Sequence, residues 1–101
     1  MARVIFTRPA AVALQRIRSY IAQDSRHYAA LTVRRIRAAV KVLGRFPESG
    51  RVVPELPEGP SWELIVGPYR VIYWYDRDED RVAIINVIHG SRTLPPLDGG
   101  A

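Results

Sequence analysis

The chain has 101 residues, a formal net charge of +5 and no cysteine. This length suits a single domain with one hydrophobic core, and the absence of thiols excludes disulfides, thiolate zinc sites and cysteine nucleophiles. The N-terminal segment MARVIFTRPA reaches charge and proline early, so it predicts neither a signal peptide nor a membrane span, and we expect a cytoplasmic protein.

The charge is unevenly distributed along the chain. Residues 1–51 hold eleven Arg or Lys against two acidic residues, a balance of +9, whereas residues 52–101 have a balance of −4. Nearly all cations of the basic half are arginines, whose planar guanidinium suits phosphate or carboxylate better than the point charge of lysine. This half therefore favours an RNA, DNA or acidic protein partner, with a solvated helix face as the alternative.

Residues 3–6 form a short apolar segment, as expected of a first strand, and a helix is predicted after them. Thr7 is a suitable N-cap, and Pro9 fits the first turn of a helix. Apolar residues then recur at helical spacing up to about Ala22, which predicts one helix face directed at a core. These apolar positions are Ala10, Leu14, Ile17 and Ile21.

A second helix is predicted after a loop of a few residues. Asp24 or Ser25 is suited to cap this helix, and Gly44 and Pro47 end it. Its apolar positions repeat the same spacing and are Ala29, Val33, Ile36, Val40 and Leu43. The short loop predicts an antiparallel hairpin packed on one face of a sheet. The side chains expected to point outward are Arg34, Arg35, Arg37 and Lys41.

The second half predicts a loop and then three strands. Residues 46–60 contain four prolines and two glycines, so we expect a connecting loop there. The segments ELIV, YRVIYWY and RVAIINVI follow, each of strand length and separated by turn signals, which predicts an antiparallel meander. Arg70 opens the middle strand, and His89 and Arg92 close the last, so these cationic groups are expected at one end of the sheet.

Together these elements define an α+β fold, in which an N-terminal strand precedes an antiparallel helix hairpin packed on one face of a small, mainly antiparallel β-sheet. The predicted domain covers residues 1–94, and residues 95–101 lack periodicity and bulk, as in a flexible tail. The compact acidic segment from Asp76 to Asp80 predicts a solvated hairpin turn and not a metal site.

The order of strand, helix hairpin, FPxxGR loop and meander, with the motifs RFPESGRVVPEL, GPYRVIY and VIHGSR, resembles the RelE/ParE superfamily of bacterial type II toxins. The resemblance covers nearly the whole chain and depends on the joint order and spacing of the motifs. It implies a small α+β toxin, without cofactor or metal, that a co-expressed antitoxin neutralises in a toxin–antitoxin hetero-oligomer, usually by wrapping the toxin surface.

Two activities are known in this superfamily, and the resemblance leaves both open. RelE and YoeB-like toxins cut mRNA on the ribosome, whereas ParE-like toxins poison DNA gyrase without nuclease chemistry. Metal-free RNA cleavage needs a base, an acid and cations near the phosphate. By resemblance, Glu55 is the candidate base and His89 the candidate acid. Arg70 would hold the scissile phosphate, and Arg51 and Arg92 would add positive charge. The sequence favours mRNA cleavage, with gyrase as the alternative.

Other features of the sequence count against the nuclease. YoeB-like enzymes follow their histidine with a catalytic tyrosine, whereas Gly90 follows His89, and the loop lysines of RelE-like enzymes are missing. Each candidate also has a structural role open to it. Arg70 is placed to pair with Glu63 on the neighbouring strand, His89 to be a hydrogen-bonded structural residue, and Glu55 to be a solvated loop carboxylate.

Overall fold

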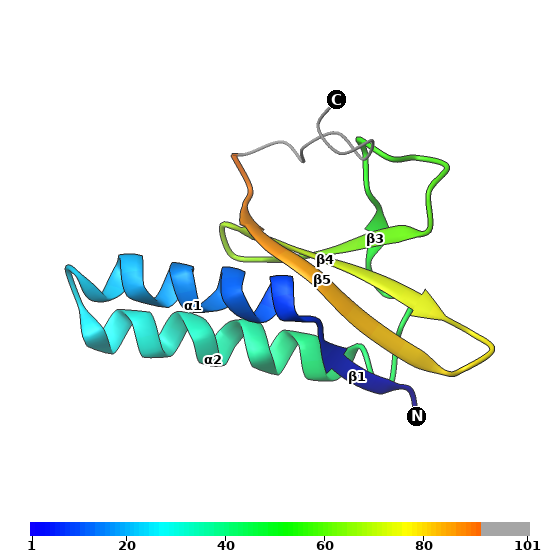
Figure 1. The fold of residues 1–101 in the computed structure, drawn as a ribbon, viewed down its shortest axis with the longest axis horizontal. Coiled ribbons are helices and arrows are strands. Elements are labelled where there is room, and N and C mark those ends of the chain that lie inside the picture. The colour runs from blue at the N-terminus through cyan, green and yellow to red at the C-terminus, as the bar shows by residue number, and fades with distance from the viewer. Residues whose placement is uncertain (92–101) are drawn as a thin grey trace.

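The computed structural model describes residues 1–91, where two helices pack against a five-stranded sheet (Figure 1). The elements are β1 (Arg3–Phe6), α1 (Arg8–Ala22), α2 (Arg26–Val42), β2 (Arg51–Val52), β3 (Ser61–Val66), β4 (Tyr69–Asp76) and β5 (Arg81–His89). The predicted α+β architecture, with its N-terminal strand and helix hairpin, is confirmed. The predicted end of the domain at residue 94 and the tail at residues 95–101 lie outside the described residues and stay predictions.

Side-chain caps fix the start of each helix. The Thr7 hydroxyl accepts a hydrogen bond from the amide of Ala10 at 3.5 Å and donates one to the carbonyl of Ile84 on β5 at 2.7 Å. The Ser25 hydroxyl accepts a bond from the amide of Tyr28 at 3.0 Å, so Ser25, and not its acidic neighbour, caps α2. The bond to β5 ties the beginning of α1 to the sheet. Within residues 1–91, no helix is long and apolar enough to cross a membrane.

The strand order is β1-β5-β4-β3-β2, so the first strand of the chain lies at one edge beside the last. β1 runs parallel to β5, and the other neighbouring strands are antiparallel. One expectation is wrong: residues 46–60 are not loop throughout. Residues 51 and 52 form the edge strand β2, which pairs with β3.

The sheet has two different faces. One face packs against the helix hairpin, and we call it the helix face. Its buried side chains belong to the hydrophobic core and are Val71, Tyr73, Val82, Ile84 and Val87. Side chains alternate along each strand, so the opposite face, the open face, carries Glu63 and Ile65 on β3 and Arg70, Ile72 and Trp74 on β4. The loop between β2 and β3 lies on the side away from the helices (Figure 1). This loop inserts Val53, which is fully buried.

A β-bulge interrupts the pairing of β4 with β5. Tyr73 pairs with Ile84 and Ile72 pairs with Asn86, so Ile85 has no partner on β4. The extra residue reverses the alternation of side chains along β5. The residues of β5 that follow Ile85 therefore lie on the face opposite to the one they would occupy in a strand without the bulge.

Gly50, just before β2, fits tightly against the backbone of β3 and the Tyr73 side chain, and its replacement should destabilise the fold. Its amide donates a hydrogen bond to the Tyr73 hydroxyl at 3.0 Å. A Cβ at this position would lie 2.5 Å from the carbonyl oxygen of Glu63 and 2.6 Å from the Tyr73 hydroxyl. We therefore expect Gly50→Ala to lower the free energy of unfolding by about 1–3 kcal/mol in urea titrations. Gly59→Ala is the control, since its Cβ would approach no atom closer than 3.5 Å. Equal stability of the two variants would contradict the prediction.

Candidate functional site

The guanidinium of Arg70 lies between two carboxylates on the open face. Its Nε donates to Glu63 Oε1 at 2.7 Å. Its Nη1 and Nη2 donate to the two carboxylate oxygens of Glu55 at 2.8 and 2.7 Å, a bidentate pair. Only 9% of the Arg70 side chain is exposed, against 27% for Glu55. The loop carboxylate therefore occupies the side of Arg70 that faces outward.

Glu63 joins Arg70 to a second arginine. Its carboxylate is fully buried, and its Oε2 accepts a bond from Arg51 Nε at 2.6 Å. The strand register explains this contact, since Arg51 is the direct partner of Glu63 across β2 and β3. Two cations and two carboxylates thus alternate in the order Arg51, Glu63, Arg70, Glu55, and we call this set the ion network. Within residues 1–91, no buried side-chain polar atom lacks a hydrogen-bond partner.

The ion network keeps Arg70 charged. The hydrogen bonds that Arg70 donates to Glu55 raise the pKa of Arg70, and the bond to Glu63 and the negative charge of Glu63 add to this, against the opposing effect of burial. Arg70 is therefore a permanent cation whose charge is balanced within the protein. A phosphate that binds Arg70 from outside therefore has to displace the Glu55 carboxylate or share the Arg70 guanidinium with it.

A groove of about 280 Å³ opens beside the ion network. Three members of the ion network, Arg51, Glu55 and Arg70, line it together with residues that include Ile65, Pro68 and Tyr69. The structure thus brings together three of the residues that the sequence selected. Among residues 1–91, no cluster of three or more histidine and acidic side chains is arranged to hold a metal ion.

His89 lies at the same end of the sheet as Arg70 but on the other face. It pairs across the strands with Tyr69, and the two rings form an edge contact with centroids 5.7 Å apart. Arg70 pairs instead with Ile88, so its side chain and that of His89 project from opposite faces. The His89 ring is exposed; its Nδ1 accepts a bond from the amide of Ser91 at 3.1 Å and lies 2.7 Å from the Ser91 hydroxyl. The predicted acid and phosphate ligand therefore do not meet.

The sequence-based site is assembled only in part. Arg51, Glu55 and Arg70 converge, His89 is separated from them by the sheet, and Arg92 lies outside the described residues. The catalytic roles given to these residues stay predictions. The pairing of Arg70 with Glu63, predicted as its structural role, is confirmed. The sequence missed that Glu55 also binds Arg70 and that Glu63 also holds Arg51. An available signal was the acidic Glu63 within the apolar segment WELIV, because a buried carboxylate requires a cationic partner.

Two solved toxin–antitoxin structures share this fold. The structure described as the chromosomal ParDE TA system from P. aeruginosa has a TM-score of 0.70 and 22% identity, and it covers 88% of this chain and 96% of that chain. The toxin–antitoxin complex RelBE2 from Mycobacterium tuberculosis has a TM-score of 0.61 and 24% identity, and covers 87% and 90%. The fold of this chain is thus shared with one structure described as a ParDE system and one described as a RelBE2 complex.

Sequence comparison identifies the family. The family described as "ParE toxin of type II toxin-antitoxin system, parDE" matches residues 4–94. Toxin RelE2 of Caulobacter vibrioides is 36% identical over 92 residues, which cover 91% of this chain and 99% of the relative. The chain belongs to the ParE toxin family of type II toxin–antitoxin systems, within the RelE/ParE superfamily.

Proposed function

We propose that this toxin inhibits growth by poisoning DNA gyrase and not by cleaving mRNA. The observation that carries the proposal is the separation of His89 from Arg70 on opposite faces of the sheet. An acid, a base and a phosphate ligand act in one step only when all three contact the same substrate. Membership of the ParE family supports the same target.

The ion network supports this proposal in a second way. Glu55 holds the outward side of Arg70 through two hydrogen bonds of 2.7 and 2.8 Å. A general base must be able to accept the proton of a substrate hydroxyl at hydrogen-bond distance. Here both oxygens of the candidate base already contact the candidate phosphate ligand. In this arrangement the two residues stabilise the loop against the sheet, which is a structural role.

We further infer that the toxin forms a complex with a cognate antitoxin. The two solved structures compared above are described as toxin–antitoxin systems. The basic half of the chain, with its balance of +9, offers an electrostatic match to an acidic antitoxin segment. Purification of the toxin together with the product of the adjacent gene tests this partner, and failure of the two proteins to co-purify would count against it.

Purified toxin is expected to inhibit negative supercoiling by gyrase and to leave mRNA intact in a reconstituted translation system. Inhibition should disappear when the toxin is first mixed with its antitoxin, which serves as the control for the specific effect. A toxin that arrests growth but has no effect on gyrase would contradict the proposal.

Cleavage of mRNA is the second candidate function. It is favoured by the 36% identity to a protein named Toxin RelE2 and by the groove that Arg51, Glu55 and Arg70 share. Ribosome-dependent cuts would identify this activity. If His89 is then the general acid, His89→Gln should slow cleavage by about a hundredfold or more. The same variant should leave gyrase inhibition unchanged if the first function holds.

A further inference from the structure

One side of α2 carries a stripe of cations, and α2 itself contains no acidic residue. At about 100° of rotation per residue, four basic residues fall within about 80° of the helix circumference. These residues, the basic stripe, are Arg26, Arg34, Arg37 and Lys41, and all are exposed. No acidic residue occurs from residue 25 to residue 47. Within residues 1–91, no salt bridge includes a member of the stripe.

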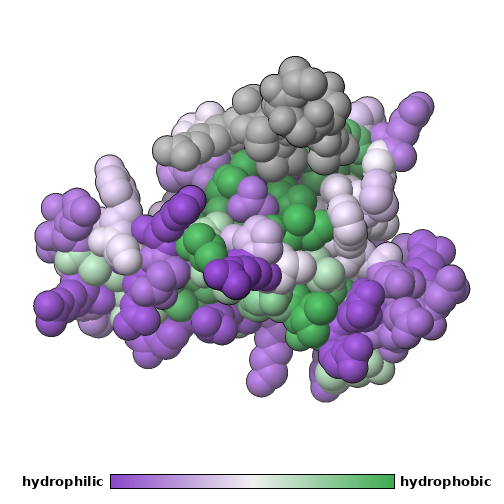
Figure 2. Space-filling model, viewed as in Figure 1, coloured by the Kyte–Doolittle hydropathy of each residue, from purple (hydrophilic) through white to green (hydrophobic). Residues whose placement is uncertain are grey.

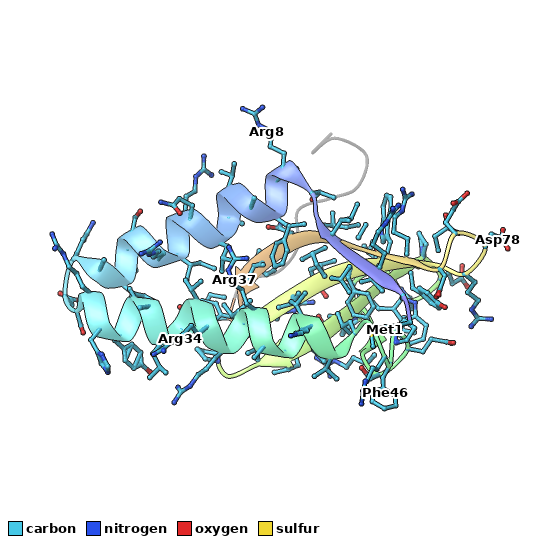
Figure 3. All side chains as sticks on the ribbon, turned by 90° about the horizontal axis from the view of Figure 1, so that it is seen from below. Met1, Arg8, Arg34, Arg37, Phe46 and Asp78 are labelled. Atoms are coloured by element: carbon cyan, nitrogen blue, oxygen red, sulfur yellow. The ribbon has the colours of Figure 1, made fainter. Side chains whose placement is uncertain are left out.

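Figure 2 shows hydrophilic side chains over much of the hairpin at the left of the view. In Figure 3, Arg37 lies between the two helices, whereas Arg34 projects outward from α2. The stripe thus reaches from the groove between the helices to the outer surface of the hairpin.

A shallow hollow between the helices brings a cation of α1 beside the stripe. Arg18 of α1 and Arg37 of α2 both line this hollow of about 130 Å³, together with Gln15 and the apolar side chains of Phe6 and Val33. The Arg37 guanidinium lies over the Phe6 ring at 5.6 Å, a cation–π contact that fixes its position. Two arginines from different helices therefore line one hollow, and an anion bound there would relieve the repulsion between their positive charges.

We propose that the basic stripe and Arg18 bind the phosphate backbone of duplex DNA. From residue 26 to residue 41 the stripe extends about 22 Å along the helix, and duplex DNA presents one charge per roughly 1.7 Å of its axis. Arginine provides three of the four cations of the stripe, and its fork suits phosphate oxygens. The choice of DNA over other nucleic acids rests on the proposed function, because gyrase acts on duplex DNA.

The composition of the surface favours a duplex over a single strand or a peptide. Single-stranded nucleic acids are bound through aromatic side chains that stack on bases, and the stripe contains none. Exposed aromatic residues of the hairpin, Tyr20 and Tyr28, lie near its tip. A bound peptide would need apolar anchors, whereas the stripe itself contains Ala30 between its cations, and the Phe6 ring in the hollow is covered by the Arg37 guanidinium. A small residue there allows close approach of a phosphate backbone.

Fluorescence anisotropy of a short labelled DNA duplex tests the proposal with the full chain. Binding should weaken with salt, with a slope of log K against log salt of about −4 for four to five phosphate contacts. The double variant Arg18→Gln, Arg37→Gln should reduce this slope by about 2 and the affinity by more than about tenfold at about 0.1 M salt. The matched control, Arg77→Gln with Arg81→Gln, removes the same formal charge from the β4–β5 turn and the start of β5, and binding should weaken less than about threefold.

An equal loss in the control pair would overturn the proposal, because it would show attraction by net charge alone. Tighter binding to duplex RNA, or equal competition by poly-glutamate, would also overturn it. The binding assay contains no gyrase, so its failure is distinct from failure of the proposed function. Absence of DNA binding rejects this inference and leaves the gyrase target standing. DNA binding with unaffected gyrase supports the inference and rejects that target.

Discussion

Replacement of Glu63 by Gln is expected to lower the free energy of unfolding by about 3 kcal/mol. Glu63 is fully buried and pairs with both Arg70 and Arg51. Its removal leaves the positive charge of Arg70 buried with a single counter-charge, Glu55. Removal of one partner from a buried ion pair destabilises proteins by about 3–5 kcal/mol. We expect the lower end of this range because the bidentate contact with Glu55 persists.

Urea unfolding followed by tryptophan fluorescence measures this effect, and Glu48→Gln is its matched control. Glu48 also pairs with an arginine, Arg77, at 2.6 Å, but the two side chains are 48% and 70% exposed. Exposed pairs contribute less than about 1 kcal/mol, so the control should remain close to wild type. Similar losses in the two variants would contradict the buried role of Glu63. A loss of about 3 kcal/mol is a large fraction of the stability of a small domain, which is about 5–15 kcal/mol.

Replacing Glu63 and Arg70 together separates the contribution of their charges to stability from the contribution of their packing. Leucine at both Glu63 and Arg70 removes the buried charges together, and such exchanges are often neutral or stabilising. The double variant should therefore recover more than half of the stability lost in Glu63→Gln. If it recovers none, the contribution of the pair lies in its shape and hydrogen bonds and not in charge balance.

The helices and strands could be predicted from the sequence because their signals are local. Thr7 and Ser25 mark helix starts, and the spacing of apolar residues in each helix identifies the buried stripe. The acidic turn and the Gly67-Pro68 turn separate the strands of the meander. Each of these features depends on residues a few positions apart, so a reading of the sequence detects them.

The arrangement of the site could not be predicted in the same way, because it depends on contacts between distant segments. The face on which His89 lies is set by a bulge at Ile85, in a strand whose apolar residues run without clear alternation. The contact between Glu55 and Arg70 depends on the path of a proline-rich loop over the open face. Strand β2 is two residues long and is defined by its pairing with β3. Sequence spacing therefore placed Arg70 and His89 at the correct end of the sheet without resolving their faces.

Truncation of Tyr73 to Ala is expected to lower the free energy of unfolding by about 3–5 kcal/mol, as for other large aromatic residues in cores. Tyr73 is fully buried in the middle of β4 and stacks against Trp62 at a ring distance of 6.4 Å. Its hydroxyl accepts the hydrogen bond from Gly50. Tyr73→Phe keeps the ring and should lose only about 1 kcal/mol, the contribution of that bond. Equal losses in the Ala and Phe variants would contradict the assignment of most of the effect to packing.

The buried hydroxyl of Tyr73 should also make the stability of the fold depend on pH in the alkaline range. Burial raises the pKa of the Tyr73 hydroxyl above its ordinary value of 10.0, and the nearby charge of Glu48 adds to this, against the Gly50 hydrogen bond. Because the unfolded chain then loses this proton first, the contribution of Tyr73 is complete below about pH 10 and falls as pH rises through the folded pKa. Tyr73→Phe should therefore show a shallower loss of stability above pH 10 than the wild type. Burial also raises the pKa of Tyr69, so part of the alkaline loss should remain in that variant. Parallel pH profiles for the two proteins would show that Tyr73 does not ionise during unfolding.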